Sequence, residues 1–207
     1  MRREELDELH YITPIVNISS ILSRGILSHK LADRFPHESV AMQEVQDIRT
    51  NKLVPGTGNH TLHDYANVYV CAKNPMIFKR KDAHTEICVL RIATTILDIN
   101  GVIITDRNAA ASIARFRPAT AGLSFLDREQ VFADDWRHPG DEREFLNHRG
   151  IKCAEVLVPG RIPPSYILGA YVSCAQSQAR LSEIAPDLKI SNSPNGKLLL
   201  IASVTFS

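Results

Sequence analysis

The sequence has almost no excess of charge of either sign. Its 207 residues include 24 lysines and arginines against 23 aspartates and glutamates, a formal net charge of +1 at pH 7. A protein that coats duplex nucleic acid carries a strong positive field, because its cations neutralise phosphates along the backbone. The near-neutral balance therefore argues against that class and leaves room for a small, locally basic nucleic-acid site.

Long hydrophobic runs are also missing. No apolar stretch approaches the roughly 20 residues that a membrane-spanning helix needs, and residues 1–5 show no hydrophobic signal segment. We therefore expect a cytoplasmic protein without membrane contact. A chain of about 200 residues can bury roughly 70% of the surface that its unfolded form exposes, so it needs no disulfide or metal to stabilise a core.

Cysteine is scarce and scattered. The four cysteines lie far apart, each in an apolar, strand-like run: Cys71, Cys88, Cys153 and Cys174. Because none forms a Cys-x-x-Cys pair, they are interpreted as small buried hydrophobic residues and not as zinc ligands. The one His-x-x-His pair, His60 and His63, lies beside a glycine-rich segment without a third ligand nearby, so no metal site is predicted.

Hydrophobic periodicity predicts an α+β fold in a single domain over residues 1–207, without internal repeats or linkers. The expected helices cover residues 2–8, 15–24, 39–52, 107–114 and 175–184. The expected strands cover residues 10–13, 66–72, 86–92, 101–105, 154–158, 166–174 and 198–204. Residues 29–38 and 115–150 lack periodicity, and long irregular segments in a compact domain are usually functional loops or wrongly assigned elements.

Glu155 is the first candidate for chemistry, because it is a lone carboxylate in an otherwise apolar strand. Strand alternation places it on one face together with Cys153 and Leu157. An unpaired buried carboxylate is costly, so such groups are retained mostly where they are paired or used. The pattern alone leaves open a structural glutamate at a strand end, held by one of the many arginines.

Arg49 is the second candidate. It lies near the C-terminal end of the helix expected over residues 39–52, where the helix dipole favours any cation. An arginine there can also hold a phosphate through two parallel hydrogen bonds. Spacing alone does not choose between these two roles.

Hydrogen-bonding side chains gather in the first strand and at the helix entry that follows it: His10, Tyr11, Thr13 and Asn17. Thr13 stands before Pro14, which is also the pattern of an N-cap followed by proline at the first helical position. Tyr69 and Met76 have the character of sheet core residues when they are considered alone.

Five motifs occur in order over roughly residues 9 to 175. They are LHYITPIVNISSILSRGILSH at 9–29, VQDIR at 45–49, LHDY at 62–65 with NPM at 74–76, ITDRN at 104–108 and AEVLVP at 154–159. Each motif alone is weak, but together they resemble the DarT family of DNA ADP-ribosyltransferase toxins. The resemblance implies an ADP-ribosyltransferase fold, in which a split pair of β-sheets flanked by helices surrounds an NAD cleft.

The resemblance also implies roles for individual residues. Glu155 takes the catalytic position, and Arg49 contacts the NAD+ phosphates and assists at the base being modified. Contacts with NAD+ are implied for His10, Tyr11, Thr13, Asn17, Gly25, Leu27 and Tyr69. Contacts with the DNA substrate are implied for Met76, Arg107, Asn108, Trp136 and Arg149. For Trp136, stacking on a base and anchoring the 115–150 segment to the core both stay open.

The implied activity is that of a toxin that transfers ADP-ribose from NAD+ to a nucleobase in single-stranded DNA and releases nicotinamide. Breaking the bond between nicotinamide and ribose develops oxocarbenium character on the sugar, so a fixed carboxylate stabilises the transition state. A base inside a duplex does not reach such a cleft, which favours single-stranded DNA. NAD+ is then a co-substrate, no metal is required, and thymine is predicted ahead of guanine.

Further implications concern partners and departures from the family pattern. A DarG-type macrodomain antitoxin is implied as a partner, and we expect a monomer. The family often has Tyr-His where this chain has His10-Tyr11, so Tyr11 is expected to face the site. Some relatives carry histidine at the position of Asn108, which leaves the target base open. The alternatives are a transferase acting on RNA or protein and an inactive NAD- or DNA-binding module.

Overall fold

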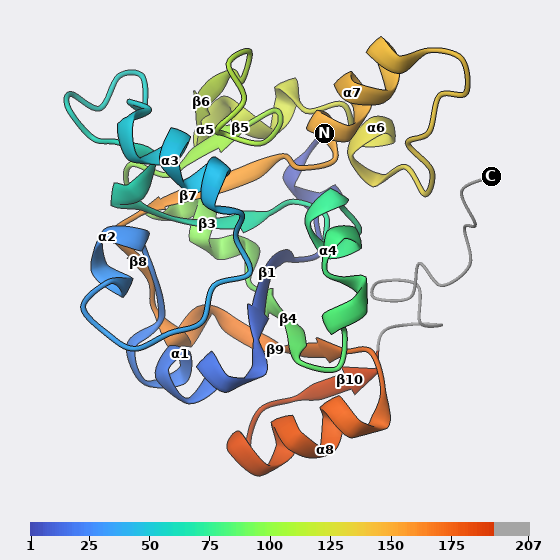
Figure 1. Cartoon of the computed structure of the whole chain (residues 1–207). Helices are drawn as coiled ribbons and strands as arrows, with labels where there is room; N and C mark the ends of the chain where they lie inside the picture. The colour runs from blue at the N-terminus through green and yellow to red at the C-terminus, as the bar shows by residue number, and fades with distance from the viewer. Residues whose placement is uncertain (193–207) are drawn as a thin grey trace.

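The computed structural model describes residues 1–192, and its main element is an eight-stranded sheet with the order β10-β9-β4-β1-β3-β7-β5-β6 (Figure 1). Its strands are β1 (Leu9–Pro14), β3 (Tyr65–Tyr69), β4 (Ile87–Ile92), β5 (Ile103–Thr105), β6 (Phe116–Pro118), β7 (Glu155–Pro159), β9 (Ile167–Val172) and β10 (Ile190–Asn192). A second sheet pairs β2 (Ile26–Leu27) with β8 (Arg161–Ile162).

The large sheet is split between β1 and β3. These two strands share one pair of residues in register, His10 opposite Tyr69. In contrast, β1 pairs with β4 at six positions and β3 pairs with β7 at five. In Figure 1, β3 and β7 run across the view while β1 runs down it. The expected pair of β-sheets is therefore confirmed as two halves that diverge from a single bridge.

The helices lie around these two half-sheets. They are α1 (Ile18–Arg24), α2 (His29–Ala32), α3 (Gln43–Asn51), α4 (Pro75–Lys79), α5 (Ala119–Gly122), α6 (Arg128–Phe132), α7 (Glu142–Ile151) and α8 (Ala175–Ile184). Short 3-10 turns cover Arg3–Glu5, Ile15–Asn17, Leu62–Asp64, Lys81–Ala83, Thr94–Asp98, Leu123–Phe125 and Pro164–Tyr166. The start of α4 is fixed by Asn74, whose side chain accepts hydrogen bonds from the Met76 and Ile77 N–H groups.

One glycine and one strand show how the sequence produces this arrangement. Gly25 ends α1 with φ of 89°, and a Cβ there would collide with the carbonyl oxygen of Ile162, so glycine is required. Ala154, just before β7, and Val156 and Val158 within it pack into the main core, while Glu155 lies on the opposite face. The alternation expected for this strand is confirmed.

Most expected elements are present, with ends shifted by a few residues. The helix over residues 175–184 is confirmed, and so are the six strands expected between residues 10 and 174. Residues 15–24 begin as a 3-10 turn before α1, and the helix expected from residue 39 begins only at Gln43. The strand expected over residues 198–204 lies outside the described residues.

Two expectations about local structure are wrong. Residues 2–8 form only a short 3-10 turn, and residues 107–114 form turns in place of a helix. In that segment the Asn108 side chain accepts from the Ala110 N–H, a local bond that competes with a helix. For residues 115–150, the second of the two alternatives holds, because the segment contains elements that periodicity did not show: β6, α5, α6 and α7.

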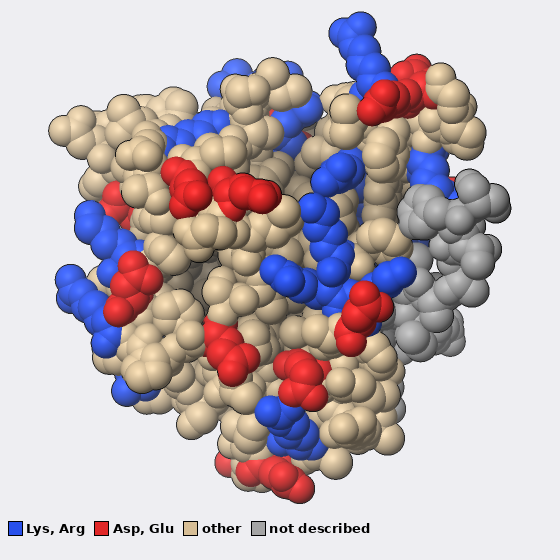
Figure 2. Space-filling view, in the orientation of Figure 1, with Lys and Arg blue, Asp and Glu red and all other residues tan. Residues whose placement is uncertain are grey.

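Charged side chains of both signs are spread over the surface, in agreement with the balanced composition. On the face shown in Figure 2, Lys and Arg side chains gather over α4, beside a hollow in the surface. Within residues 1–192, no helix is long and apolar enough to cross a membrane. The same residues contain no cluster of three or more His, Cys, Asp or Glu side chains that could hold a metal ion.

Candidate active site

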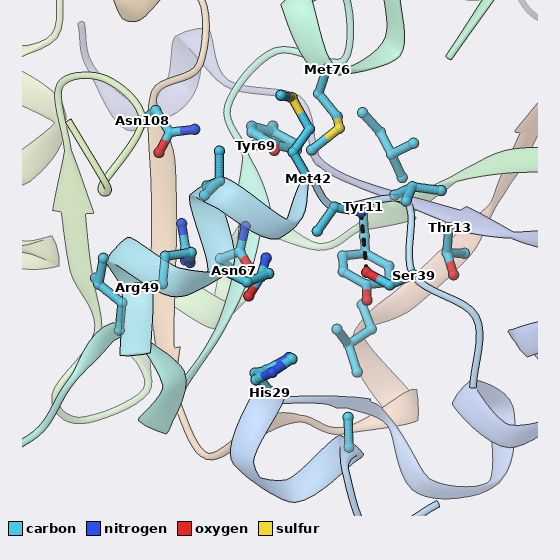
Figure 3. A pocket seen from close by; sticks show the side chains of 18 of the residues that line it. Tyr11, Thr13, His29, Ser39, Met42, Arg49, Asn67, Tyr69, Met76 and Asn108 are labelled. Atoms are coloured by element: carbon cyan, nitrogen blue, oxygen red, sulfur yellow. Dashed lines mark hydrogen bonds between the residues drawn. The ribbon is translucent and has the colours of Figure 1, made fainter. Parts of the chain in front are cut away.

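A cavity of about 490 Å³ lies where the two half-sheets diverge (Figure 3). Both sides contribute, with Tyr11 and Thr13 from β1 and Asn67 and Tyr69 from β3. Further lining residues come from α1, β2, α2, α3, α4, α7 and the 33–42 loop, defined as the segment between α2 and α3. Its size falls in the range of about 300–1,000 Å³ that is typical of small-molecule and cofactor sites.

Glu155 and Arg49 form a buried ion pair at this cavity. Glu155 is fully buried at the start of β7, opposite Tyr69 on β3 and Thr105 on β5. The Arg49 Nη1 atom lies 3.1 Å from Glu155 Oε2 and 3.4 Å from Oε1. A second donor, the backbone N–H of Ala109, lies 3.4 Å from Oε1. The carboxylate is thus held in one orientation by donors from α3 and from the loop after β5.

One donor of Arg49 has no partner among the described residues. Its Nη2 atom is buried and makes no hydrogen bond, although Arg49 is only 5% exposed and lines the cavity. A buried polar group without a partner is costly and calls for an explanation, such as a ligand that completes it. The arrangement therefore offers a fixed cationic donor to an anionic or strongly polar ligand.

Lys52 fixes the loop that lies over Glu155. Its ammonium donates to the carbonyl oxygen of Ala111 and lies 5.6 Å from the centre of the Phe116 ring. Burial lowers the pKa of Lys52, and the nearby Arg49 charge lowers it further. A second bond, from the Asn108 N–H to the carbonyl of Gly150, ties this loop to the end of α7. These contacts position Asn108 at the rim of the cavity.

Two tyrosines provide neutral phenols in the cavity wall. Burial raises the pKa of Tyr11 to about 12. Burial, followed by the neighbouring Glu155 carboxylate, holds the pKa of Tyr69 well above its usual range. Both side chains therefore stay protonated at any physiological pH and can donate a hydrogen bond.

The structure brings most of the sequence-predicted residues to one place. Those that line the cavity are Tyr11, Thr13, Asn17, Gly25, Leu27, Arg49, Tyr69, Met76, Asn108 and Arg149. Glu155 lies behind Arg49, with which it is paired. Three others, His10, Arg107 and Trp136, are not among the residues that line the cavity.

The side chains outside the lining have partners of their own. The Nε2 atom of His10 lies 3.3 Å from Glu8 Oε1, and Arg107 donates to Asn147 over 3.2 Å. Trp136 covers the buried ammonium of Lys152, which lies 5.5 Å from the ring centre. That ammonium also donates to the carbonyls of residues 131 and 133 over 2.7 and 2.8 Å. In this structure Trp136 is therefore part of an anchor between the 133–136 segment and the base of β7.

Sequence reasoning assigned no role to several lining residues. His29 and His63 face each other with ring centres 4.0 Å apart, and both line the cavity. Burial, then the nearby His29 and Arg49, lowers the pKa of His63 to about 4, so its ring is neutral near pH 7. The 33–42 loop adds His37, Glu38, Ser39, Val40, Ala41 and Met42. Residues 37 and 38 fall in the segment without periodicity and residues 39–42 in the helix expected over 39–52, so no local pattern marks them as cavity-lining.

Comparison with solved structures defines the class of protein. The chain matches Thermus sp. 2.9 DarT in complex with ADP-ribosylated ssDNA with a TM-score of 0.79 and 25% identity, over 93% of this chain and 96% of that one. It matches Thermosipho africanus DarTG in complex with ADP-ribose with a TM-score of 0.79 and 26% identity, over 92% of this chain and 51% of that one. The fold is that of the DarT ADP-ribosyltransferases.

Sequence comparison gives the family. The model of the family described as "DarT: ssDNA thymidine ADP-ribosyltransferase" matches residues 10–197, and the chain belongs to this family. A DNA ADP-ribosyl transferase-DNA ADP-ribosyl glycohydrolase fusion protein of Thermosipho africanus is 32% identical over 184 residues, which are 80% of this chain and 42% of the relative. A DNA ADP-ribosyl transferase of Thermus sp. is 29% identical over 146 residues, 66% of this chain and 69% of the relative.

Two facts from these comparisons bear on function. The resemblance to DarT found in the sequence is confirmed by the family match. The chain spans less than half of the Thermosipho africanus fusion protein, 42% of its length.

Proposed function

We propose that this chain transfers ADP-ribose from NAD+ to a base of single-stranded DNA, thymine ahead of guanine, and releases nicotinamide. The observation that carries the proposal is the buried pair of Arg49 and Glu155 at the cavity, with one Arg49 donor left for a ligand. Family membership supports the same activity. A related Thermus sp. 2.9 DarT was solved in complex with NAD+ and with ADP-ribosylated ssDNA.

The chemistry assigns Glu155 to the reacting sugar. The bond between C1′ of the ribose and the nicotinamide nitrogen breaks, and the nicotinamide leaves with the electron pair. The ribose then carries positive charge, which a fixed carboxylate stabilises more in the transition state than in the ground state. A base nitrogen such as thymine N3 attacks C1′ and loses its proton, so ADP-ribosylated DNA, nicotinamide and one proton are formed.

The residues that line the cavity have matching roles. Arg49 offers Nη2 to the NAD+ phosphates while Nη1 holds the carboxylate. Tyr11 and Tyr69 are neutral phenols suited to an amide or hydroxyl of the ligand. We keep the remaining site assignments as proposals, including those for His10, Arg107 and Trp136, which do not line the cavity.

DNA is proposed to approach over α4. Met76 and Lys79 of this helix line the cavity, and Lys81 follows at its C-terminal end. Within residues 1–192, neither Lys79 nor Lys81 forms an ion pair with a carboxylate. Basic side chains gather on this face in Figure 2. A small local cluster is enough for weak, salt-sensitive contact with phosphates.

The setting of the activity is also a proposal. We infer a toxin that a DarG-type macrodomain protein counteracts, and the Thermosipho africanus relative, in which a transferase is fused to a glycohydrolase, supports this pairing. We also propose that the protein is a monomer in the cytoplasm, where both NAD+ and DNA are present. The four free cysteines, Cys71, Cys88, Cys153 and Cys174, are compatible with a reducing compartment.

The test incubates the protein with labelled NAD+ and oligonucleotides that each contain one type of base, followed by mass spectrometry of the nucleosides. We expect one ADP-ribosylated nucleoside, with thymidine modified. Glu155→Gln removes the charge without changing shape, and should lower the rate at least about 100-fold. Glu183→Gln, on the exposed surface of α8, is the matched control. Label on RNA or protein but on no DNA would contradict the proposal.

A further inference from the structure

The 33–42 loop forms one wall of the cavity, although its own residues are exposed or only partly buried. It contains no helix or strand, and none of its residues is buried. Six consecutive residues of this loop, 37–42, line the cavity. Segments with little buried apolar surface have low local stability. The conformation of this wall must therefore depend on specific polar contacts.

Asn17 makes one set of these contacts. Its Nδ2 donates to the Glu38 carbonyl over 2.7 Å and to Thr13 Oγ1 over 3.2 Å. Its Oδ1 accepts from the Glu38 N–H over 3.0 Å. A side-chain amide has two N–H donors and one carbonyl oxygen, so both donors of Asn17 are in use. Asn17 therefore both donates a hydrogen bond to the backbone of Glu38 and accepts one from it.

Arg80 makes a second set at the other end of the segment. It follows α4 and donates from Nε to the Val40 carbonyl over 2.9 Å and from Nη2 to the Ala41 carbonyl over 3.3 Å. The same helix places Lys79 Nζ 3.2 Å from the sulfur of Met42. Two consecutive carbonyls held by one planar guanidinium leave this stretch little freedom to rotate.

We infer that Asn17 and Arg80 are positioning residues that clamp the 33–42 loop in the form that binds NAD+. The inference rests on the proposed function for the identity of the ligand. It also gives Asn17 a different role from a direct contact with the nicotinamide, because both of its N–H groups are already bonded within the protein. Arg80 further ties the loop to α4, the helix that places Met76 in the same cavity.

The expected effect follows from populations. If NAD+ binds only the clamped form, the apparent Kd is the intrinsic Kd divided by the fraction of molecules in that form. Losing one clamp removes two hydrogen bonds to the loop backbone. We expect the clamped fraction to fall to about one tenth, so that the Kd for NAD+ rises about tenfold. For Arg80→Met, which is not a cavity-lining residue, the kcat at saturating NAD+ should stay within about twofold, because bound NAD+ restores the clamped form.

The experiment measures Asn17→Ala and Arg80→Met by calorimetry with NAD+ and by limited trypsin digestion without any ligand. Asn100→Ala and Arg128→Met, both at exposed positions away from the cavity lining, are the controls. Trypsin can cut after Arg34, inside the 33–42 loop, and we expect cleavage there to be about ten times faster in both clamp variants. Arg80→Lys keeps one donor and should give an intermediate rate.

The outcomes separate this inference from the proposed function. Unchanged cleavage at Arg34 in both variants, with melting curves like the wild type, overturns the clamp. Weaker NAD+ binding by Asn17→Ala without faster cleavage makes Asn17 a direct ligand contact and also overturns it. If the wild type binds no NAD+, the proposed function fails, while the digestion still decides whether the two side chains hold the loop. If one of Asn17→Ala and Arg80→Met does not fold, the other variant decides whether the clamp exists.

Discussion

Removing Arg49 should destabilise the protein as well as inactivate it. Its partner Glu155 is fully buried, and the ion pair spans 3.1 Å. Removing one partner of a buried pair leaves an uncompensated charge and costs about 3–5 kcal/mol. For a chain of about 200 residues, 1 kcal/mol shifts Tm by roughly 2–4 °C, so Arg49→Met should lower Tm by about 6–20 °C.

The assay is thermal and urea unfolding of three variants side by side. Arg49→Met leaves the carboxylate alone, whereas the double variant Arg49→Met with Glu155→Leu removes both charges. Replacing both partners of a buried pair by apolar groups is often neutral or stabilising, so the double variant should be more stable than the single one. Arg137→Met is the control, because its ion pair with Asp135 lies on the surface and should not change Tm measurably.

The result that would refute this reasoning is specific. If Arg49→Met melts within about 2 °C of the wild type, water or another cation reaches Glu155, and the pair is not the closed unit described above. If the double variant is less stable than Arg49→Met alone, the burial of charge is not what destabilises the single variant. Activity does not enter this test, since both variants lack a residue of the candidate site.

Two further predictions concern stability. The pKa of His63 is about 4 in the folded protein and about 6.5 in the unfolded chain, so between these values the unfolded chain binds more protons and stability falls as the pH drops. Urea unfolding from pH 7 to 4 should show a shallower decline for His63→Gln; equal slopes would contradict it. Gly25→Ala should lower Tm clearly more than Gly56→Ala, because both have positive φ but only the first Cβ meets a backbone oxygen, that of Ile162. Equal melting points would remove that explanation.

Short-range patterns predicted the strand that carries the catalytic candidate. Alternation over residues 153–158 depends only on the pleat of a strand. It predicts that the side chains of Glu155 and Val156 lie on opposite faces of that strand. Its pairing with Arg49 joins residues 106 positions apart, and the contact itself is not visible in any local pattern. Periodicity therefore could not place Arg49 and Glu155 in one site, whereas the resemblance to the family did.

Polar local bonds explain where sequence reasoning failed. The segment 107–114 has helical composition, but Asp106 and Asn108 use their side chains on nearby backbone N–H groups. The helix α7 did carry a signal, since Asp141 caps it and acidic residues fill its first turn. In the 33–42 loop, residues 39–42 were assigned to a helix, whereas the backbone of residues 38, 40 and 41 is hydrogen-bonded to the side chains of Asn17 and Arg80, contacts that no local pattern shows.

The single bridge between β1 and β3 means that little backbone hydrogen bonding fixes the angle between the two half-sheets. Each half-sheet keeps its own ladder, six pairs between β1 and β4 and five between β3 and β7, whatever the angle between the halves. In the backbone ladder, opening or narrowing the cavity would therefore disturb one residue pair, His10 with Tyr69, whereas the apolar core that both halves share would have to repack. Tyr11 travels with one half and Glu155 with the other, so the width of the site can adjust to its contents at little cost in backbone hydrogen bonds.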